Sequence, residues 1–187
     1  MLIEAFKNFS GTILSGGTTQ GIAGLVGDVR QHYGNSIHTI GYIPSFVPTD
    51  GTATVDQNRN RYDEIRRTNG SDFSPLEPLQ NWIDLVAAGI EPKDVKVLGI
   101  NGGTIAAAEY RIAAALGAQV VLLEKSGREA AKAFTDPDWE GSPRLVGMPT
   151  DAMTIRAFVG CGRLKLSPEQ CDVIAQGVHE AFHRNRV

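Results

Sequence analysis

The stretch GTILSGGTTQGIAGLVGDV, Gly11 to Val29, decides the expected fold because it reads as a buried strand, a glycine-threonine turn and a helix. Glycines at the start of a helix leave backbone N–H groups unpaired beside the positive end of the helix dipole. Such a turn favours an anion, most often a phosphate. Its spacing fits neither a P-loop, since Ile22 and Ala23 follow Gly21, nor the dinucleotide fingerprint G-x-G-x-x-G.

A second turn of the same kind lies within KVLGINGGTIAAAEYRIAAALG, Lys96 to Gly117. Each turn follows a strand and precedes a helix, so in a parallel sheet both open at the carboxyl edge. We therefore expect the two turns to face one phosphate-containing ligand. The alternative is that Gly102 and Gly103 only let the helix lie close to the sheet.

Short β-branched runs alternate with longer helical patterns along the chain, which is typical of βα units. The pattern predicts a single α/β domain over 1–187, with a Rossmann-like, mostly parallel sheet of five or more strands and helices on both faces. The predicted strands are Gly11–Leu14, Ser36–Ile43, Val95–Ile100, Gln119–Leu123 and Pro143–Gly147. The predicted helices are Thr19–Tyr33, Pro75–Ala88, Thr104–Leu116, Gly127–Phe134, Ala152–Val159 and Pro168–Asn185.

The predicted helix Pro75–Ala88, which follows the second predicted strand, has explicit boundary signals. Ser74-Pro75-Leu76-Glu77 predicts a capping box, and glycines at 89 and 117 predict left-handed helix ends. The apolar spacing within this helix predicts a buried stripe. Its members are Leu76, Leu79, Ile83 and Val86.

The segment Pro44–Phe73 is polar and long for a connection in a compact domain. It contains four arginines, Arg59, Arg61, Arg66 and Arg67. One interpretation is a flap whose arginines reach phosphates at the strand ends. The other is a solvated charged excursion without a ligand.

Composition argues against nucleic-acid binding, a membrane span, a disulfide framework and a metal site. The chain has 187 residues, 42% of them hydrophobic, and a formal net charge of -3, so no global basic field attracts nucleic acid or anionic lipid. No apolar run is long enough to span a bilayer, and we expect a cytoplasmic protein. Cys161 and Cys171 are too few for a disulfide framework. His179 and His183 form an HExxH pattern without a third ligand nearby, and we expect no metal.

The segments LSGGTTQGIAGLVGDV and NGGTIAAAEYRIAAALGAQVVLL, with FSPLEPLQNWIDLVAAGI between them, resemble the SLOG superfamily, specifically the branch similar to the sensor region of TRPM-type channels. The resemblance runs from about Ser10 to Val159. It implies a Rossmann-like sheet, a ligand such as ADP-ribose or cyclic ADP-ribose, no other cofactor, a homo-oligomer, and a role in signalling or antiviral defence through a fused or associated effector. The chain is compatible with a domain excised from such an effector protein.

A related branch, the lysine decarboxylase-like phosphoribohydrolases, carries the motif P-G-G-x-G-T-x-x-E. Glu109 falls at the motif's glutamate, whereas Asn101, Ile105 and Ala106 replace its proline, third glycine and threonine. The resemblance implies an alternative function, hydrolysis of a nucleoside 5'-monophosphate at its N-glycosidic bond with Glu109 as the acting carboxylate. Because Ile105 would obstruct close backbone approach, we expect binding without catalysis.

Further candidates lie at other strand ends. Ser126, Gly127 and Arg128 form a third helix start that can meet a ribose or phosphate, although Ser126 can be an ordinary N-cap. Tyr42 can stack on adenine or belong to the core, and capping is the default for Thr150 and Asp151. The predicted ligand-binding residues are Ser15, Gly16, Gly17, Thr18, Tyr42, Arg59, Arg66, Gly102, Gly103, Thr104, Glu109, Ser126 and Gly127.

Overall fold

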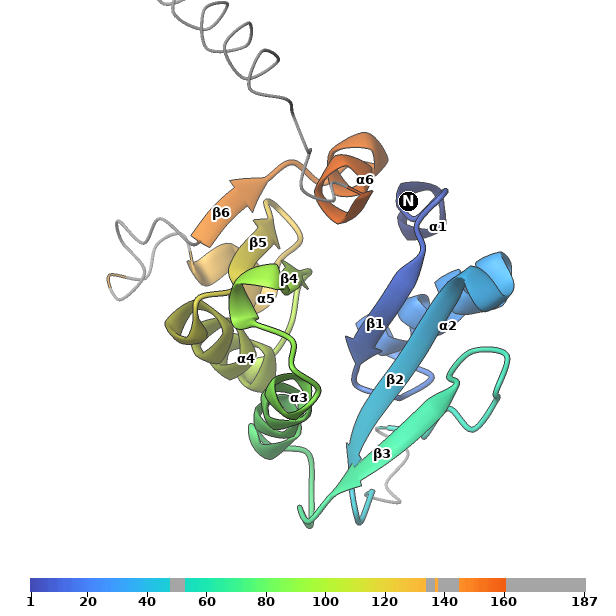
Figure 1. Ribbon diagram of the computed structural model, residues 1–187. Coiled ribbons are helices and arrows are strands. Elements are labelled where there is room, and N and C mark those ends of the chain that lie inside the picture. The colour runs from blue at the N-terminus through green and yellow to red at the C-terminus, as the bar shows by residue number, and fades with distance from the viewer. Residues whose placement is uncertain (48–52, 134–136, 138–144, 161–187) are drawn as a thin grey trace, which may run out of the picture.

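The computed structural model describes residues 1–47, 53–133, 137 and 145–160, and its strands form two three-stranded parallel sheets (Figure 1). The first sheet has the order β1 (Gly11–Ser15), β2 (Ile37–Pro44), β3 (Glu64–Thr68). The second has the order β4 (Lys96–Gly99), β5 (Gln119–Leu123), β6 (Leu145–Met148). The mixed α/β class and the parallel pairing are as expected, whereas a single sheet of five or more strands is wrong.

The division into two sheets has a physical explanation in the edge strands. β1 and β4 are short, and most of their residues are only partly buried or exposed. Ile13 of β1 and Leu98 of β4 both pack against one hydrophobic cluster, so side chains connect the two halves without a described backbone ladder between them. Hydrophobic periodicity identifies strands, but it does not determine which distant edges form hydrogen bonds.

The helices agree with the predicted positions to within a few residues. Those predicted are α2 (Gly21–Tyr33), α3 (Leu76–Ala87), α4 (Thr104–Leu116), α5 (Arg128–Lys132) and α6 (Ala152–Gly160). Short α1 (Leu2–Ala5) and the 3₁₀ turns η1 (Gly34–Ser36) and η2 (Pro92–Asp94) were not predicted. No helix in the described ranges is long and apolar enough to cross a membrane. The predicted helix 168–185, both cysteines and the HExxH pattern lie outside the described residues.

Two hydrophobic clusters form the core. One joins Val29 and Ile37 from the first half of the chain to Leu123 and Ile155 from the second. The other surrounds the second sheet and includes Trp82 of α3 together with Tyr110 of α4. The first of these clusters therefore joins the two halves of the chain through side chains.

The segment Pro44–Phe73 contains an unpredicted strand, which replaces the flap interpretation. β3 pairs with β2 in parallel, and Tyr42 lies opposite Arg66 in the register. Its sequence, EIRRT, lacks the apolar alternation that would have identified a strand. Pairing with the buried strand β2 supplies the order that this polar sequence does not encode by itself.

Helix α3 has the hydrogen bonds of the predicted capping box, but its first residue and its burial differ from the prediction. Leu76 donates its backbone N–H to Oγ of Ser74, and Glu77 accepts the backbone N–H of Ser74 at 2.7 Å. The helix begins at Leu76 with Pro75 as its N-cap residue, whereas Ser74 was expected in that position. The glycine after this helix has φ 77° and the glycine after α4 has φ 100°. The predicted buried stripe is wrong because Trp82 and Leu85 pack on the core instead. The four residues that we expected to be buried are exposed: Leu76, Leu79, Ile83 and Val86.

Candidate functional site

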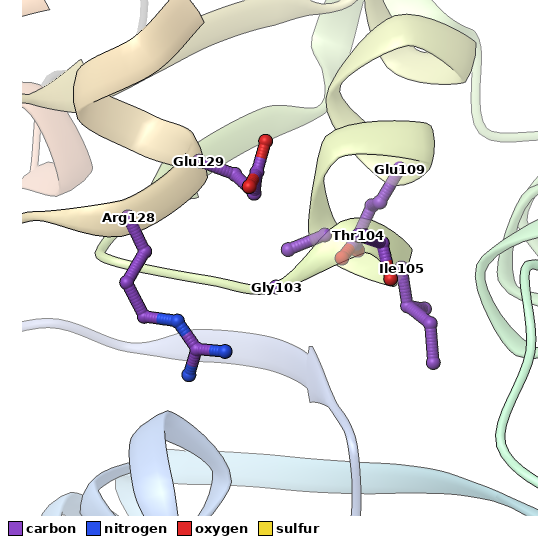
Figure 2. A pocket seen from close by; sticks show the side chains of 7 residues that line it. Gly103, Thr104, Ile105, Glu109, Arg128 and Glu129 are labelled. Carbon is purple, nitrogen blue, oxygen red and sulfur yellow. The ribbon is translucent and has the colours of Figure 1, made fainter.

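A pocket of about 440 Å³ lies at the turn between β4 and α4 (Figure 2). The lining side chains reach it from α4 and from the start of α5. They are Gly103, Thr104, Ile105, Ala106, Glu109, Arg128 and Glu129. The volume is within the range of small-molecule sites, about 300–1,000 Å³. The second glycine turn therefore has open space beside it.

The backbone of this turn is shaped by Asn101 and Gly102, which both have positive φ, 57° and 83°. A Cβ atom on Gly102 would lie 2.6 Å from Cβ of Ala106 and 3.0 Å from the hydroxyl of Tyr110. Gly102 is therefore required for close approach of α4, as the packing alternative proposed. Gly103 differs, because the nearest atom to its added Cβ is Nη2 of Arg128, 3.8 Å away.

The first turn of α4 presents backbone donors to the pocket. Gly103 is the N-cap residue, and Ala107 donates its N–H to the carbonyl of Gly103 at 3.0 Å. The preceding amides, at residues 104–106, have no acceptor within the helix because they belong to its first turn. The dipole of this 13-residue helix adds a positive potential at the same point. Together these groups can bind an anion.

The neighbouring turn after β5 is locked to the first by hydrogen bonds. Oγ of Ser126 accepts the N–H of Asn101 at 2.9 Å and donates to the carbonyl of Leu123 at 2.7 Å. Ala130 donates its N–H to the carbonyl of Asn101 at 2.9 Å. The predicted N-cap role of Ser126 is wrong, since Gly127 occupies that position. Ser126 instead acts as a positioning residue that connects the two turns.

Three ionisable side chains line the pocket: Arg128, Glu129 and Glu109. Arg128 extends from the start of α5 and Glu109 from the second turn of α4 (Figure 2). Burial raises the pKa of Glu109 to about 7. No hydrogen bond or ion pair to its carboxylate is found among the described residues. The carboxyl group therefore holds its proton to a higher pH than a solvated glutamate does, and it can serve as an acid, a base or a neutral hydrogen-bond donor.

The first glycine turn is occupied by the protein itself. Thr19 donates its N–H to the carbonyl of Thr54 at 2.8 Å, and Asp56 donates its N–H to the carbonyl of Gly17 at 3.0 Å. Gly17 has φ 64°, and a Cβ on Gly41 would lie 2.4 Å from its Cα. These glycines let the turn cross closely over β2.

The aromatic ring below this turn reinforces the same packing role. Tyr62 is buried, and its hydroxyl donates to the carbonyl of Ala23 at 2.9 Å. Burial raises the pKa of Tyr62 to about 12, although hydrogen bonds with Ser15 and Gly17 oppose the shift. Gly16 and Thr18 lie on the outside of this turn, where Thr18 bridges to Val55. The turn is thus held by residues 54–62 and is absent from the pocket lining.

Arg61 is part of the scaffold and not of a ligand flap. Its Nε donates to Oδ2 of buried Asp56 at 2.6 Å, its Nη2 donates to the carbonyl of Gly24 at 2.9 Å, and its Nη1 pairs with Asp28. A Cβ on Gly27 would lie 2.8 Å from this guanidinium. The glycine face of α2 therefore accommodates an arginine, which the sequence pattern alone did not indicate.

Tyr42 and Arg66 lie together on the face of the first sheet that meets α3. The Tyr42 hydroxyl donates to Oδ2 of Asp84 at 2.7 Å, and Nη1 of Arg66 donates to the same oxygen at 2.9 Å. Arg66 also pairs with Glu64 at 2.9 Å. Tyr42 is buried, so the core alternative describes it. Arg59 is exposed on the turn before β3.

The pocket brings together only part of the predicted set. Gly103, Thr104 and Glu109 line it, while Gly102 and Gly127 shape its backbone. The remaining predicted residues are not in its lining: Ser15, Gly16, Gly17, Thr18, Tyr42, Arg59, Arg66 and Ser126. Glu129 was missed and Arg128 was left out of the predicted binding set, although its position at a helix start after β5 was the available signal. Asp151 caps α6 by accepting the N–H of Thr154 at 2.9 Å, as expected.

A scan against protein-family models and a search of the curated proteins both find no match to this chain. The described residues also include no group of three or more His, Cys, Asp or Glu side chains arranged to hold a metal ion. The groups that line the pocket therefore indicate which chemistry the site can support.

Proposed function

We propose that this chain is a ligand-sensing domain that binds an NAD-derived nucleotide signal, of the ADP-ribose or cyclic ADP-ribose type, with a phosphate at the start of α4. The pocket beside Gly103, with Arg128 facing the first turn of that helix, carries the proposal. Backbone donors, a helix dipole and a guanidinium are the groups that bind phosphate in other proteins.

Four of the pocket residues have distinct parts in binding the ligand. Gly103 leaves space for a phosphate oxygen to approach the backbone, and Thr104 adds a hydroxyl at the helix start. Arg128 neutralises the phosphate charge. Glu109, when protonated, can donate a hydrogen bond to a ribose or phosphate oxygen, so its raised pKa reduces repulsion of an anionic ligand.

The proposal uses one phosphate anchor where the sequence suggested two converging turns. The first turn is covered by residues 54–56 and its arginine neighbour Arg61 is paired with Asp56. The resemblance to the SLOG superfamily supports the ligand class, the homo-oligomer and regulation of an effector in bacterial signalling or antiviral defence.

An enzymatic function is the second candidate, and the environment of Glu109 favours it specifically. A carboxyl group with a pKa near 7 is suited to general acid–base catalysis. In this reaction the N-glycosidic bond of a nucleoside monophosphate breaks, water adds to the ribose carbon, and the base leaves with a proton. Glu109 would supply or accept that proton.

Titration calorimetry with ADP-ribose, cyclic ADP-ribose and AMP tests the proposal. A charge-assisted bond contributes about 1.5–3 kcal/mol, so we expect Arg128→Ala to weaken binding by about tenfold or more. Arg59→Ala is the matched control, since Arg59 is exposed and outside the pocket lining. Equal affinities of wild type and Arg128→Ala, or no binding of any of the three, would contradict the proposal.

Product analysis of the same mixtures separates sensor from enzyme. Release of free base or ribose phosphate that is lost in Glu109→Gln would establish the hydrolase function. Binding of intact ligand without turnover supports the sensor.

A further inference from the structure

Helix α3, the green helix in Figure 1, has large apolar residues that are exposed, whereas its two charged residues, Glu77 and Asp84, form hydrogen bonds with the first sheet. Leu79, Ile83 and Val86 are 44%, 52% and 56% exposed. Glu77 is buried and accepts the hydroxyl of Thr68 at 2.5 Å. A helix on the surface of a monomer normally has the opposite arrangement, with its polar side in water.

The second charged residue, Asp84, is held inward by two donors. The Tyr42 hydroxyl lies 2.7 Å and Nη1 of Arg66 lies 2.9 Å from Oδ2 of Asp84. Gln80 donates to the other carboxylate oxygen at 2.8 Å. The polar contacts between α3 and the first sheet thus fix the rotation of the helix, and this rotation turns its apolar residues outward.

The exposed apolar residues follow the spacing of a helix-packing seam. Those within the helix are separated by three, four and three positions, and we call them the α3 stripe: Leu76, Leu79, Ile83 and Val86. Such 3–4 spacing aligns side chains along one side of a helix, where a second helix can interdigitate with them. The stripe extends for about 15 Å along the axis.

We infer that the α3 stripe is the centre of an interface with a second copy of this chain, in which two α3 helices pack across a two-fold axis. A two-fold contact places one surface against itself, so a charged residue close to the axis faces its own copy. The stripe avoids this repulsion because Glu77 and Asp84 are turned inward.

The composition and extent of this face also favour a second copy. Homodimer interfaces are more apolar than other interfaces and their cores are depleted in charged residues. A stable interface buries about 800 Å² per partner, which is more than one helix face supplies. Helix α4 contacts α3, and we infer that the interface continues onto α4, whose last residue, Leu116, is 46% exposed.

Sedimentation velocity of the full chain over a range of concentrations tests the inference. We expect a dimer for wild type and a monomer for Ile83→Glu. Leu25→Glu is the matched control, because Leu25 is a large apolar residue on α2 with a similar exposure, 44%; this variant should stay dimeric. Circular dichroism melts establish that each variant is folded.

Hydrogen exchange of wild-type protein supplies a readout that needs no variant. We expect amides of residues 79–90 to exchange more slowly as protein concentration rises. Wild-type protein that stays monomeric at every concentration would overturn the inference. This holds also if another part of the same chain covers the stripe in that monomer. A dimer that persists in folded Ile83→Glu would overturn it too, because another surface would then hold the copies together.

Discussion

Removal of the Arg61 side chain should destabilise the protein strongly without involving the ligand site. Arg61→Ala leaves the carboxylate of Asp56, 2% exposed, without its 2.6 Å partner, and removes the hydrogen bond to the carbonyl of Gly24. Loss of one partner of a buried pair costs about 3–5 kcal/mol. For a chain of this size each kcal/mol lowers the Tm by about 2–4 °C, so we expect a decrease on the order of 10 °C.

Thermal and urea unfolding measure this effect, and Arg59→Ala is the control two residues away. Arg59 is exposed, and its variant should change the free energy of unfolding by less than about 0.5 kcal/mol. A double-mutant cycle with Asp56→Ala should show a coupling of about 0.5–3 kcal/mol between the two side chains. Equal stability of Arg61→Ala and Arg59→Ala would refute the structural role of Arg61.

Three further predictions concern the second turn and the pH dependence of folding. Gly103→Ala should weaken nucleotide binding in calorimetry and leave the Tm unchanged, because Arg128 is the neighbour within 4 Å of the added Cβ. Gly102→Ala should lower the Tm, because its Cβ would lie 2.6 Å from Cβ of Ala106. Burial raises the pKa of Glu109 to about 7, so between about pH 4.5 and 7 the native chain binds more protons than the unfolded chain. The free energy of unfolding should therefore fall as pH rises through this range. Urea titrations should show that Glu109→Gln removes this decrease. Nε and Nη2 of Arg30 lie 2.9 and 2.8 Å from the Asp63 carboxylate and lower the pKa of that carboxyl group. This pair should therefore stabilise the native state above about pH 4, and the stabilisation should be lost on further acidification. Asp63→Asn should have a lower free energy of unfolding at pH 7 and a smaller decrease of it in acid.

Local signals in the sequence determined the helices well. The capping box at Ser74–Glu77 and the glycines that end α3 and α4 act within a few residues of the chain, and the structure has them as expected. Helix α4 begins and ends where its pattern predicts. Such boundaries depend on neighbouring residues alone, and a single sequence contains that information.

Long-range features could not be predicted in the same way. The rotation of α3 depends on hydrogen bonds from Tyr42 and Arg66, which belong to distant strands. The arginine beneath α2, Arg61, comes from a segment with no strand-like pattern. In both cases a polar contact between residues far apart in the sequence determines the packing, and the local sequence pattern does not contain that contact.

The candidate site was predicted in part for the same reason. Gly103, Thr104 and Glu109 form one turn-helix unit, and local sequence brings them together. The first turn can belong to the site only if no other segment covers it. Residues 54–56 cover it through backbone hydrogen bonds, and such bonds leave no pattern of side chains in the sequence. The sequence therefore indicated two turns that could bind phosphate, and the pocket of about 440 Å³ lies at the second.

Amide chemical shifts recorded by NMR during titration with ADP-ribose test the phosphate anchor most directly. The account predicts the largest, saturable shifts at Gly103, Thr104 and Ile105, with smaller ones at Arg128 and Glu129. Shifts centred on residues 15–18 with none at 103–105, or no saturable shift anywhere, would contradict it.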